Sequence, residues 1–199
     1  MNRHASLVFS RHILLCVCLV AGMAAGCAVK PVIPPADALD PGEHAAMLRG
    51  ILRHGDWLVT RGVHGADNLV ATVTRMPLSH ASLYDAEDDG VIEADGSGIH
   101  RTTLEDLIAK SQRLLVIRPI WSTAESASVA VERARSWIGK GYNFTGLVGL
   151  DMPDRYYCTQ LCIEAYRPFI TVNPDNPIPK VIPPGRMYFW GRILFDTGP

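Results

Sequence analysis

The sequence lacks an excess of charge of either sign: 19 Lys and Arg face 20 Asp and Glu, for a formal net charge of -1. No cluster of basic residues overrides that balance, so we expect no nucleic-acid partner. A hydrophobic fraction of 48% and a charged fraction of 20% exclude a disordered chain. A length of 199 residues predicts one globular domain with an ordinary core, plus additional segments.

The sequence also lacks the spacing of a metal-binding motif. His54, His64 and His100 could in principle join His80 around an ion, but no HExxH pattern or close His pair is present. We therefore predict neither a metal site nor a cofactor.

Acidic residues are missing from the N-terminal segment, where the first one is Asp37. Arg3 and Arg11 precede an apolar run, Ile13–Val20, and small residues then lead to Cys27. A basic start, an apolar centre and a small-residue exit are the layout of a secretory signal peptide, here residues 1–26. The apolar run is short for a transmembrane helix.

The end of this segment, Ala24-Ala25-Gly26-Cys27, resembles a bacterial lipobox, although Leu is more usual at the position of Ala24. The resemblance implies that Cys27 is diacylated and becomes the new N-terminus. Each buried CH₂ contributes about 0.8 kcal/mol, so two or three acyl chains anchor a domain stably. Ala28 and Val29 follow Cys27, where many Gram-negative lipoproteins that stay in the inner membrane have an Asp. The expected location is therefore the bacterial cell envelope and, if the source is Gram-negative, the outer membrane facing the periplasm. An ordinary cleaved signal and an uncleaved anchor are the alternatives.

Two thiols remain once the signal is removed and Cys27 is lipidated. Cys16 and Cys18 belong to the signal, which leaves Cys158 and Cys162 four residues apart. On a helix this spacing places both on one face, where a disulfide between them is not favoured. An exported domain that keeps free thiols favours a functional role for one of them.

The remaining chain divides into a proline-rich tether, residues 27–42 including Cys27, and a domain over residues 43–199. The mixture of periodicities predicts an α+β domain with a largely antiparallel sheet. Helices are predicted over residues 44–54, 66–76, 103–109, 123–138 and 156–166, and strands around Trp57, over 79–85, 91–95 and 114–120, and within 187–195. A proline-studded loop is predicted over 173–184.

Cys158 is the candidate nucleophile because it falls in the first turn of a predicted helix, where the helix dipole favours a thiolate. Cys162, one turn later, is predicted to be a small core residue. A thiol needs an imidazole to take its proton, and His80 on a predicted strand is the candidate base. Glu93 lies thirteen residues later, across a predicted hairpin, and could orient that imidazole. If the numbers of paired residues in the hairpin sum to an odd number, His80 and Glu93 lie on the same face of the sheet. Asp95 is the alternative orienting residue.

Five short motifs occur in an order that resembles the permuted NlpC/P60 papain-like family, in its YiiX/YebB-like group related to lecithin:retinol acyltransferase. They are Gly55-Asp56-Trp57-Leu58, Ser79-His80-Ala81-Ser82-Leu83-Tyr84, Val91-Ile92-Glu93-Ala94, Gly141-Tyr142-Asn143-Phe144 and Tyr157-Cys158-Thr159-Gln160-Leu161. The resemblance covers residues 48–194. It implies a circularly permuted papain-like fold in which an antiparallel sheet packs against the nucleophile helix.

The same resemblance implies roles for individual residues. Cys158 corresponds to the nucleophile, His80 to the base and Glu93 to the third polar member, and Tyr142 and Tyr157 are expected to line the substrate cleft. The chain departs from the family at Thr159-Gln160, where Ser-Glu is more common. Packing is the alternative role for Tyr142.

The expected activity is that of a cysteine hydrolase or acyltransferase working through an acyl-thioester. Its substrate is predicted to be a peptidoglycan stem-peptide amide or, by resemblance to lipid-metabolising relatives, an acyl ester or acyl amide. A non-catalytic binding module is the third possibility.

Overall fold

The computed structural model describes residues 38–171 and 177–198. The predicted signal peptide, Cys27, most of the predicted tether and part of the predicted 173–184 loop lie outside the described residues. The described elements all belong to one compact unit, Pro31–Pro199. Over the described ranges, no helix has the length and apolar character needed to cross a membrane.

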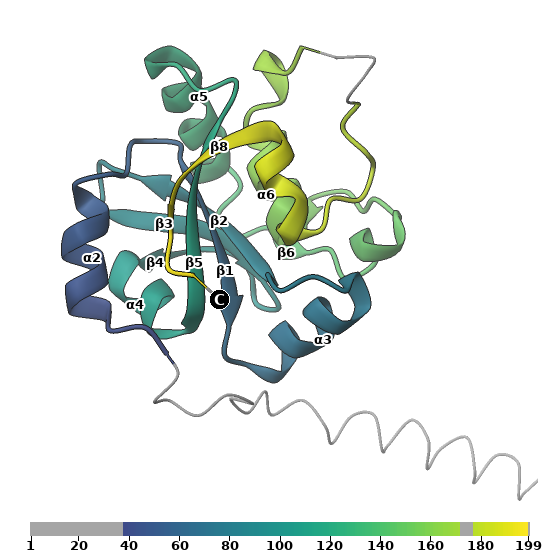
Figure 1. Ribbon diagram of the computed structural model, residues 1–199. Helices are drawn as coiled ribbons and strands as arrows, with labels where there is room; N and C mark the ends of the chain where they lie inside the picture. Colours follow the sequence, from purple (N-terminus) through teal and green to yellow (C-terminus); the bar gives the residue numbers. More distant parts are fainter. Residues whose placement is uncertain (1–37, 172–176, 199) are drawn as a thin grey trace, which may run out of the picture. The chain divides into compact units, whose positions relative to one another are not determined.

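Helices and strands are interspersed along the chain, with β2, β3 and β4 following one another directly (Figure 1). The helices are α2 (Pro41–Arg49), α3 (Gly65–Thr74), α4 (Leu104–Ala109), α5 (Ala124–Arg135) and α6 (Cys158–Ala165). Short 3-10 helices are η2 (Gly146–Val148), η3 (Arg167–Phe169) and η4 (Pro184–Trp190). The strands are β1 (Trp57–Gly62), β2 (His80–Asp85), β3 (Gly90–Asp95), β4 (Gly98–Thr103), β5 (Ser111–Pro119), β6 (Gly141–Tyr142), β7 (Arg155–Tyr156) and β8 (Gly191–Asp196).

The main sheet has six strands in the order β4-β3-β2-β1-β5-β8, and every neighbouring pair in it is antiparallel. The two-residue strands β6 and β7 form a separate parallel pair. The α+β fold class with an antiparallel sheet, predicted from the sequence, is confirmed.

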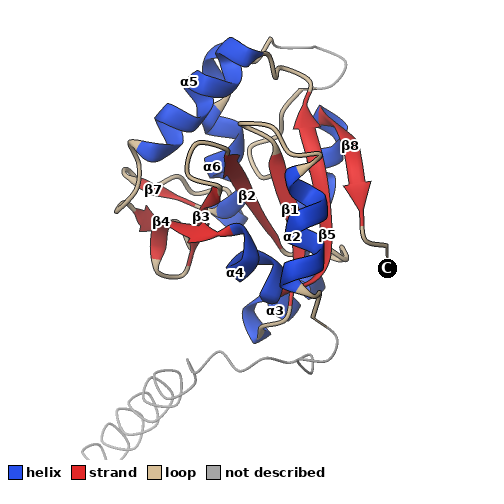
Figure 2. Ribbon diagram, turned by 90° about the vertical axis from the view of Figure 1, so that its left-hand side faces the viewer, coloured by secondary structure: helices blue, strands red, loops and turns tan. Residues whose placement is uncertain are grey.

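The main sheet is covered by helices on both faces. Alternation along β1 sends Trp57 into the apolar cluster that contains α5 and α6, and Leu58 into the cluster that contains α2 and α4. Figure 2, seen from the side of α2 and α4, shows the strands between these helices and the pair α5 and α6. The layering places the N-terminus of α6 against the strands, because α6 packs on β2 and β3.

Polar caps fix the starts of several helices. Asp40 accepts a hydrogen bond from the Glu43 amide at 2.7 Å and Pro41 occupies the first position of α2. This helix was expected over 44–54, but the cap starts it at Pro41, inside the predicted tether, and Gly50 ends it. Thr103 caps α4 and Thr123 caps α5, because each side chain accepts a hydrogen bond from the amide three residues later.

Three other predicted boundaries were wrong. Helix α5 ends at Arg135 rather than at residue 138, and α6 begins at Cys158 rather than at 156. The segment before Gly191 forms the 3-10 helix η4, not a strand. Pro183 and Pro184 stand at its start, where the fixed φ of proline suits the first helical turn. Strand β4 was not predicted at all, although it pairs with β3 along its whole length.

Asp56 anchors the chain just before β1. Its side chain is fully buried and accepts hydrogen bonds from Arg118 at 2.9 Å and 2.8 Å and from the Arg53 amide at 2.8 Å. Asp56 thus fixes the loop that enters β1.

Candidate active site

Cys158 is the first residue of α6 and its side chain lies in a nearly closed environment, with 6% of the residue exposed. The amides of a first helical turn have no acceptor within the helix, and the positive end of the dipole lies there. The geometry therefore combines a thiol with backbone N–H groups, the position that the sequence predicted.

The start of α6 is held by the residues around Cys158. Gln160 Oε1 accepts a hydrogen bond from the Tyr157 amide at 3.3 Å, and Thr159 donates to the carbonyl of Ile182 at 2.6 Å. Thr159 and Gln160, which stand where the permuted papain-like family more often has Ser-Glu, thus fix the turn that carries the thiol.

His80 is the first residue of β2, and the preceding residue secures its position. Ser79 donates to Asp67 Oδ1 at 2.7 Å and accepts from the Gly62 amide at 3.0 Å, while its own amide bonds to Thr60. The start of β2 is thereby tied to both α3 and β1, which holds the His80 backbone in place.

Glu93 reaches His80 across the β2–β3 hairpin. Ser82 pairs with Glu93, so the residue numbers sum to an odd number and His80 is a diagonal neighbour on the same face of the sheet. Glu93 Oε2 lies 2.7 Å from His80 Nε2. Asp95, the alternative carboxylate, instead lies 3.7 Å from His100.

Cys158 lies close enough to His80 to raise the pKa of the imidazole. Nε2 faces Glu93, so Nδ1 is the ring nitrogen that remains for another partner. Burial by itself lowers the pKa of His80, but the interactions with Cys158 and Glu93 outweigh it, so the pKa lies well above its ordinary value. The structure therefore brings Cys158, His80 and Glu93 together in one chain of contacts.

Glu93 carries the negative charge of this cluster inside the protein, with only 6% of its side chain exposed. Burial alone would raise the pKa of Glu93. Hydrogen bonds from His100 and His80 overcome that effect and hold the pKa well below its usual range. Glu93 is therefore an ionised, hydrogen-bonded carboxylate.

His100 belongs to the same cluster, and the sequence analysis missed it in this role. It pairs with Glu93 in the β3–β4 register, and its Nε2 lies 3.3 Å from Glu93 Oε1. A signal existed in the turn-forming Asp95-Gly96-Ser97-Gly98, which marks a second hairpin after the first.

The two tyrosines expected to line the cleft lie differently. Tyr142 is partly buried on β6, where burial and then the nearby Cys158 raise its pKa. Tyr157 is 3% exposed and its hydroxyl donates to the carbonyl of Lys180 at 3.2 Å. In this conformation the Tyr157 hydroxyl braces the start of α6.

Cys162 lies one turn after Cys158 and is completely buried in the core cluster. Burial, with the nearby Cys158, raises the pKa of the Cys162 thiol well above its ordinary value. Cys162 is thus a neutral packing residue, and both thiols are free.

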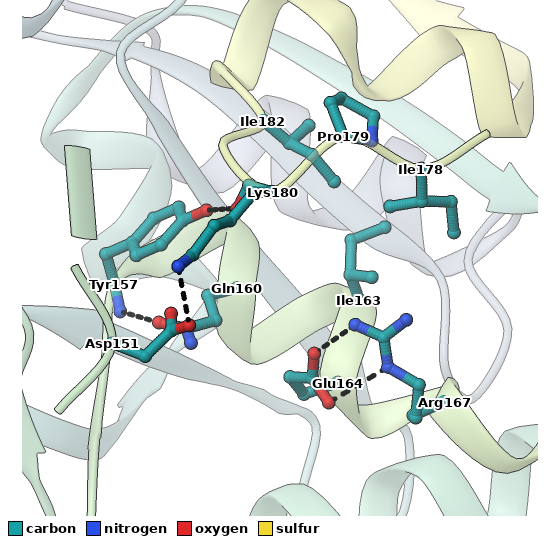
Figure 3. A pocket seen from close by; sticks show the side chains of 10 residues that line it. All are labelled: Asp151, Tyr157, Gln160, Ile163, Glu164, Arg167, Ile178, Pro179, Lys180 and Ile182. Carbon is teal, nitrogen blue, oxygen red and sulfur yellow. Dashed lines mark hydrogen bonds and ion pairs between the residues drawn. The ribbon is translucent and has the colours of Figure 1, made fainter. Parts of the chain in front are cut away.

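A pocket is lined by side chains of α6 and of the chain around Lys180 (Figure 3). Gln160, Glu164 and Arg167 line it, and a helical turn of 3.6 residues places these about half a turn away from Cys158. Its charged groups are already paired, Glu164 with Arg167 and Asp151 with Lys180. The pocket is therefore separate from the thiol cluster.

Among solved structures, the chain resembles the crystal structure of metalloprotein yiiX from Escherichia coli O157:H7 (DUF1105), with a TM-score of 0.51 and 20% identity. The match covers 59% of this chain and 66% of that chain, and it supports the fold. Within the described part of this chain, no group of three or more His, Cys, Asp or Glu side chains is placed to hold a metal ion.

No curated protein matches the chain. A sequence model described as a permuted papain-like amidase enzyme, YaeF/YiiX, C92 family, matches residues 42–178, which include His80, Glu93, Tyr142 and Cys158. The order of the cluster along the chain, with the histidine strand before the cysteine helix, agrees with that description. The protein therefore belongs to the C92 family of permuted papain-like amidases.

Proposed function

We propose that the protein is a cysteine amidase that cleaves its substrate through an acyl-thioester on Cys158. One observation carries the proposal: His80 Nε2 lies 2.7 Å from the Glu93 carboxylate, and the imidazole lies near enough to the thiol at the start of α6 for Cys158 to raise its pKa. This is the arrangement of nucleophile, base and orienting group that thiol catalysis needs.

The proposed reaction has two stages. His80 takes the thiol proton, and the Cys158 thiolate attacks the amide carbonyl carbon. The Cys158 N–H binds the oxyanion, and His80 then protonates the departing amine, leaving a thioester. Water, deprotonated by His80, attacks the thioester and releases the acid, which restores the thiol. The family's description as amidases favours water over another acyl acceptor.

The substrate class that we propose is a stem-peptide amide of peptidoglycan. Its support is the export signal expected in residues 1–26 and the lipid anchor expected at Cys27, which would place the domain in the cell envelope, on the outer membrane facing the periplasm. The membrane is then a partner through the anchor alone.

A lipid amide or ester is the second candidate, and a specific surface favours it. The segment between Tyr142 and Cys158 exposes four large apolar side chains: Phe144 at 66%, Val148 at 75%, Leu150 at 59% and Met152 at 43%. An apolar acyl chain on the substrate would cover such side chains, since large exposed apolar groups in one segment mark interaction sites.

The thiol chemistry is tested by alkylating the folded full chain with iodoacetamide near neutral pH and locating the label by mass spectrometry. We expect Cys158 to react much faster than Cys162, and His80→Ala to slow Cys158 by about 10²- to 10⁴-fold, the usual contribution of a general base. Cys162 serves as the internal control. Slow and equal labelling of both thiols would contradict the catalytic proposal and favour a binding module.

The substrate is tested by incubating the protein with muropeptides and, separately, with phospholipids and N-acyl amides. Cys158→Ala is the matched control, because it removes only the sulfur. Products formed from muropeptides by the wild type alone would support the first candidate. Products from lipids alone would replace it with the second.

A further inference from the structure

His100 is placed as an imidazolium by its two neighbours. Its Nδ1 lies 3.2 Å from the carbonyl oxygen of Gly98, and its Nε2 lies 3.3 Å from Glu93 Oε1. A carbonyl and a carboxylate only accept hydrogen bonds, so an imidazolium, with a proton on each ring nitrogen, satisfies both. The Ser97 hydroxyl also lies 3.4 Å from Nδ1. The hydrogen bond to Glu93 is the main cause that raises the pKa of His100, and the negative charge of Asp95 adds to it. Together they outweigh partial burial, which by itself would lower that pKa.

The two oxygens of Glu93 are divided between two histidines on opposite neighbouring strands. Oε2 contacts His80 on β2, and Oε1 contacts His100 on β4. A nearly buried carboxylate with a single donor would be free to rotate about its last side-chain bond and would protonate more readily. The second donor fixes both the plane and the charge of the carboxylate.

We propose that His100 is a positioning residue that acts on Cys158 through Glu93 and His80, by holding the Glu93 carboxylate ionised and aimed at His80 Nε2. The inference rests on the proposed function, because it extends the same thiol site by a fourth member. His100 itself does not touch the thiol in the contacts that the structure gives.

Charge alternates along this array, which explains why four ionisable groups can lie together. His100 and His80, whose pKa values are raised, carry positive charge, and the ionised Glu93 carboxylate lies between them. Asp95 faces His100 from β3 at 3.7 Å, and the neutral hydroxyl of Tyr142 approaches from β6. Each like-charged pair is thereby separated by an opposite charge, as a cluster removed from water requires.

A purely structural role for His100 is the competing explanation, since its ring also braces the β3–β4 turn through Gly98. Three variants of the full chain distinguish the two. His100→Leu removes both hydrogen bonds, His100→Gln keeps an N–H donor of similar reach, and His54→Gln is the matched control. His54 also lies beside a buried carboxylate, with Nδ1 3.7 Å from Asp85, outside the thiol cluster.

The measurement is the rate constant for iodoacetamide labelling of Cys158 as a function of pH, with the free energy of unfolding measured in parallel. We expect His100→Leu to lower the rate about tenfold, the value of one hydrogen bond to a charged group. The acid limb of the profile should move to higher pH, because Glu93 then protonates more readily. His100→Gln should recover part of the rate, and His54→Gln should leave the profile unchanged.

Coupling to Glu93 supplies the second criterion. If His100 acts through Glu93, then adding His100→Leu to Glu93→Gln should slow labelling no further than Glu93→Gln alone. Additive losses would show that His100 acts independently and would overturn the proposal, as would a His100→Leu profile identical to that of the wild type. This outcome differs from failure of the proposed function, in which the wild type itself would not label Cys158 selectively.

Discussion

Glu93 Oε2 and His80 Nε2 lie 2.7 Å apart across a hairpin, as diagonal neighbours on one face of the sheet. The carboxylate is nearly buried, and the imidazole side chain is 16% exposed. Two rigid strands, rather than loops, therefore set the geometry of the contact. An orienting group held in this way keeps the base in one ring orientation and one protonation pattern.

The stability given by Glu93 should depend on pH within a defined window. The pKa of Glu93 is lowered from 4.5 in the folded protein, so its contribution is fully present above pH 4.5 and is lost as pH falls through the lowered value. The pKa values of His80 and His100 are raised from 6.5 in the folded protein. The contribution of these two histidines to stability is therefore fully present below pH 6.5 and is lost as pH rises through the raised values. We expect Glu93→Gln to lower the free energy of unfolding most between pH 4.5 and 6.5, by roughly 1.5–3 kcal/mol.

Urea denaturation at a series of pH values measures this difference. Glu87→Gln is the control, because the Glu87 side chain is 66% exposed and pairs with Arg135, which keeps its charge over the whole range. Its effect should stay below about 1 kcal/mol and should not fall above pH 6.5. A Glu93→Gln difference that stays constant from pH 4 to 9 would argue against ionised histidines around Glu93.

Much of the site could be predicted because local rules determine it. Side chains alternate between the two faces of a strand, so His80 and Glu93 share a face when the numbers of paired residues sum to an odd number. The turn residues 87–90 determine which residues pair. A helix with Cys158 in its first turn also follows from the local pattern, although the predicted start lay two residues too early. The caps Thr103 and Thr123 likewise depend only on neighbours three residues away.

The rest depended on contacts between segments distant in the sequence. His100 joins the cluster only because β4 pairs with β3, and β4 has the mixed polarity of an edge strand, which periodicity does not reveal. The 3-10 helix η4 packs Met187 and Trp190 into the core, although its aromatic residues suggest a strand. The bracing of Tyr157 depends on the carbonyl of Lys180, which no local pattern indicates.

Asp56→Ala should destabilise the fold without changing the thiol chemistry. The substitution leaves Arg118, whose side chain is 16% exposed, without its bidentate partner, and breaking a buried ion pair costs about 3–5 kcal/mol. Chemical denaturation should show this loss, and the double variant Asp56→Ala/Arg118→Met should recover part of it. In the folded fraction, the labelling rate of Cys158 should equal that of the wild type; a large drop would place Asp56 in the site after all.

Cys162→Ala should separate the two thiols. Cys162 is completely buried and neutral, so its removal leaves a small cavity that costs about 1 kcal/mol. Labelling of Cys158 and any hydrolytic activity should stay at the wild-type level, whereas Cys158→Ala should abolish both. Loss of activity in a folded Cys162→Ala protein would mean that the second thiol takes part in the reaction.

Gly98→Ala should disturb the thiol site from the β3–β4 turn, and Gly139→Ala provides its matched control. Both glycines have positive φ, +109° and +92°, so either substitution strains the backbone by about 1–2 kcal/mol. A Cβ at Gly98 would also meet the Lys140 carbonyl oxygen at 2.5 Å, whereas a Cβ at Gly139 meets nothing within 4 Å. Relief of that clash must move the turn that carries His100. We therefore expect both variants to lose stability in denaturation, but only Gly98→Ala to slow the labelling of Cys158. Equal labelling rates would show that the site tolerates displacement of the turn.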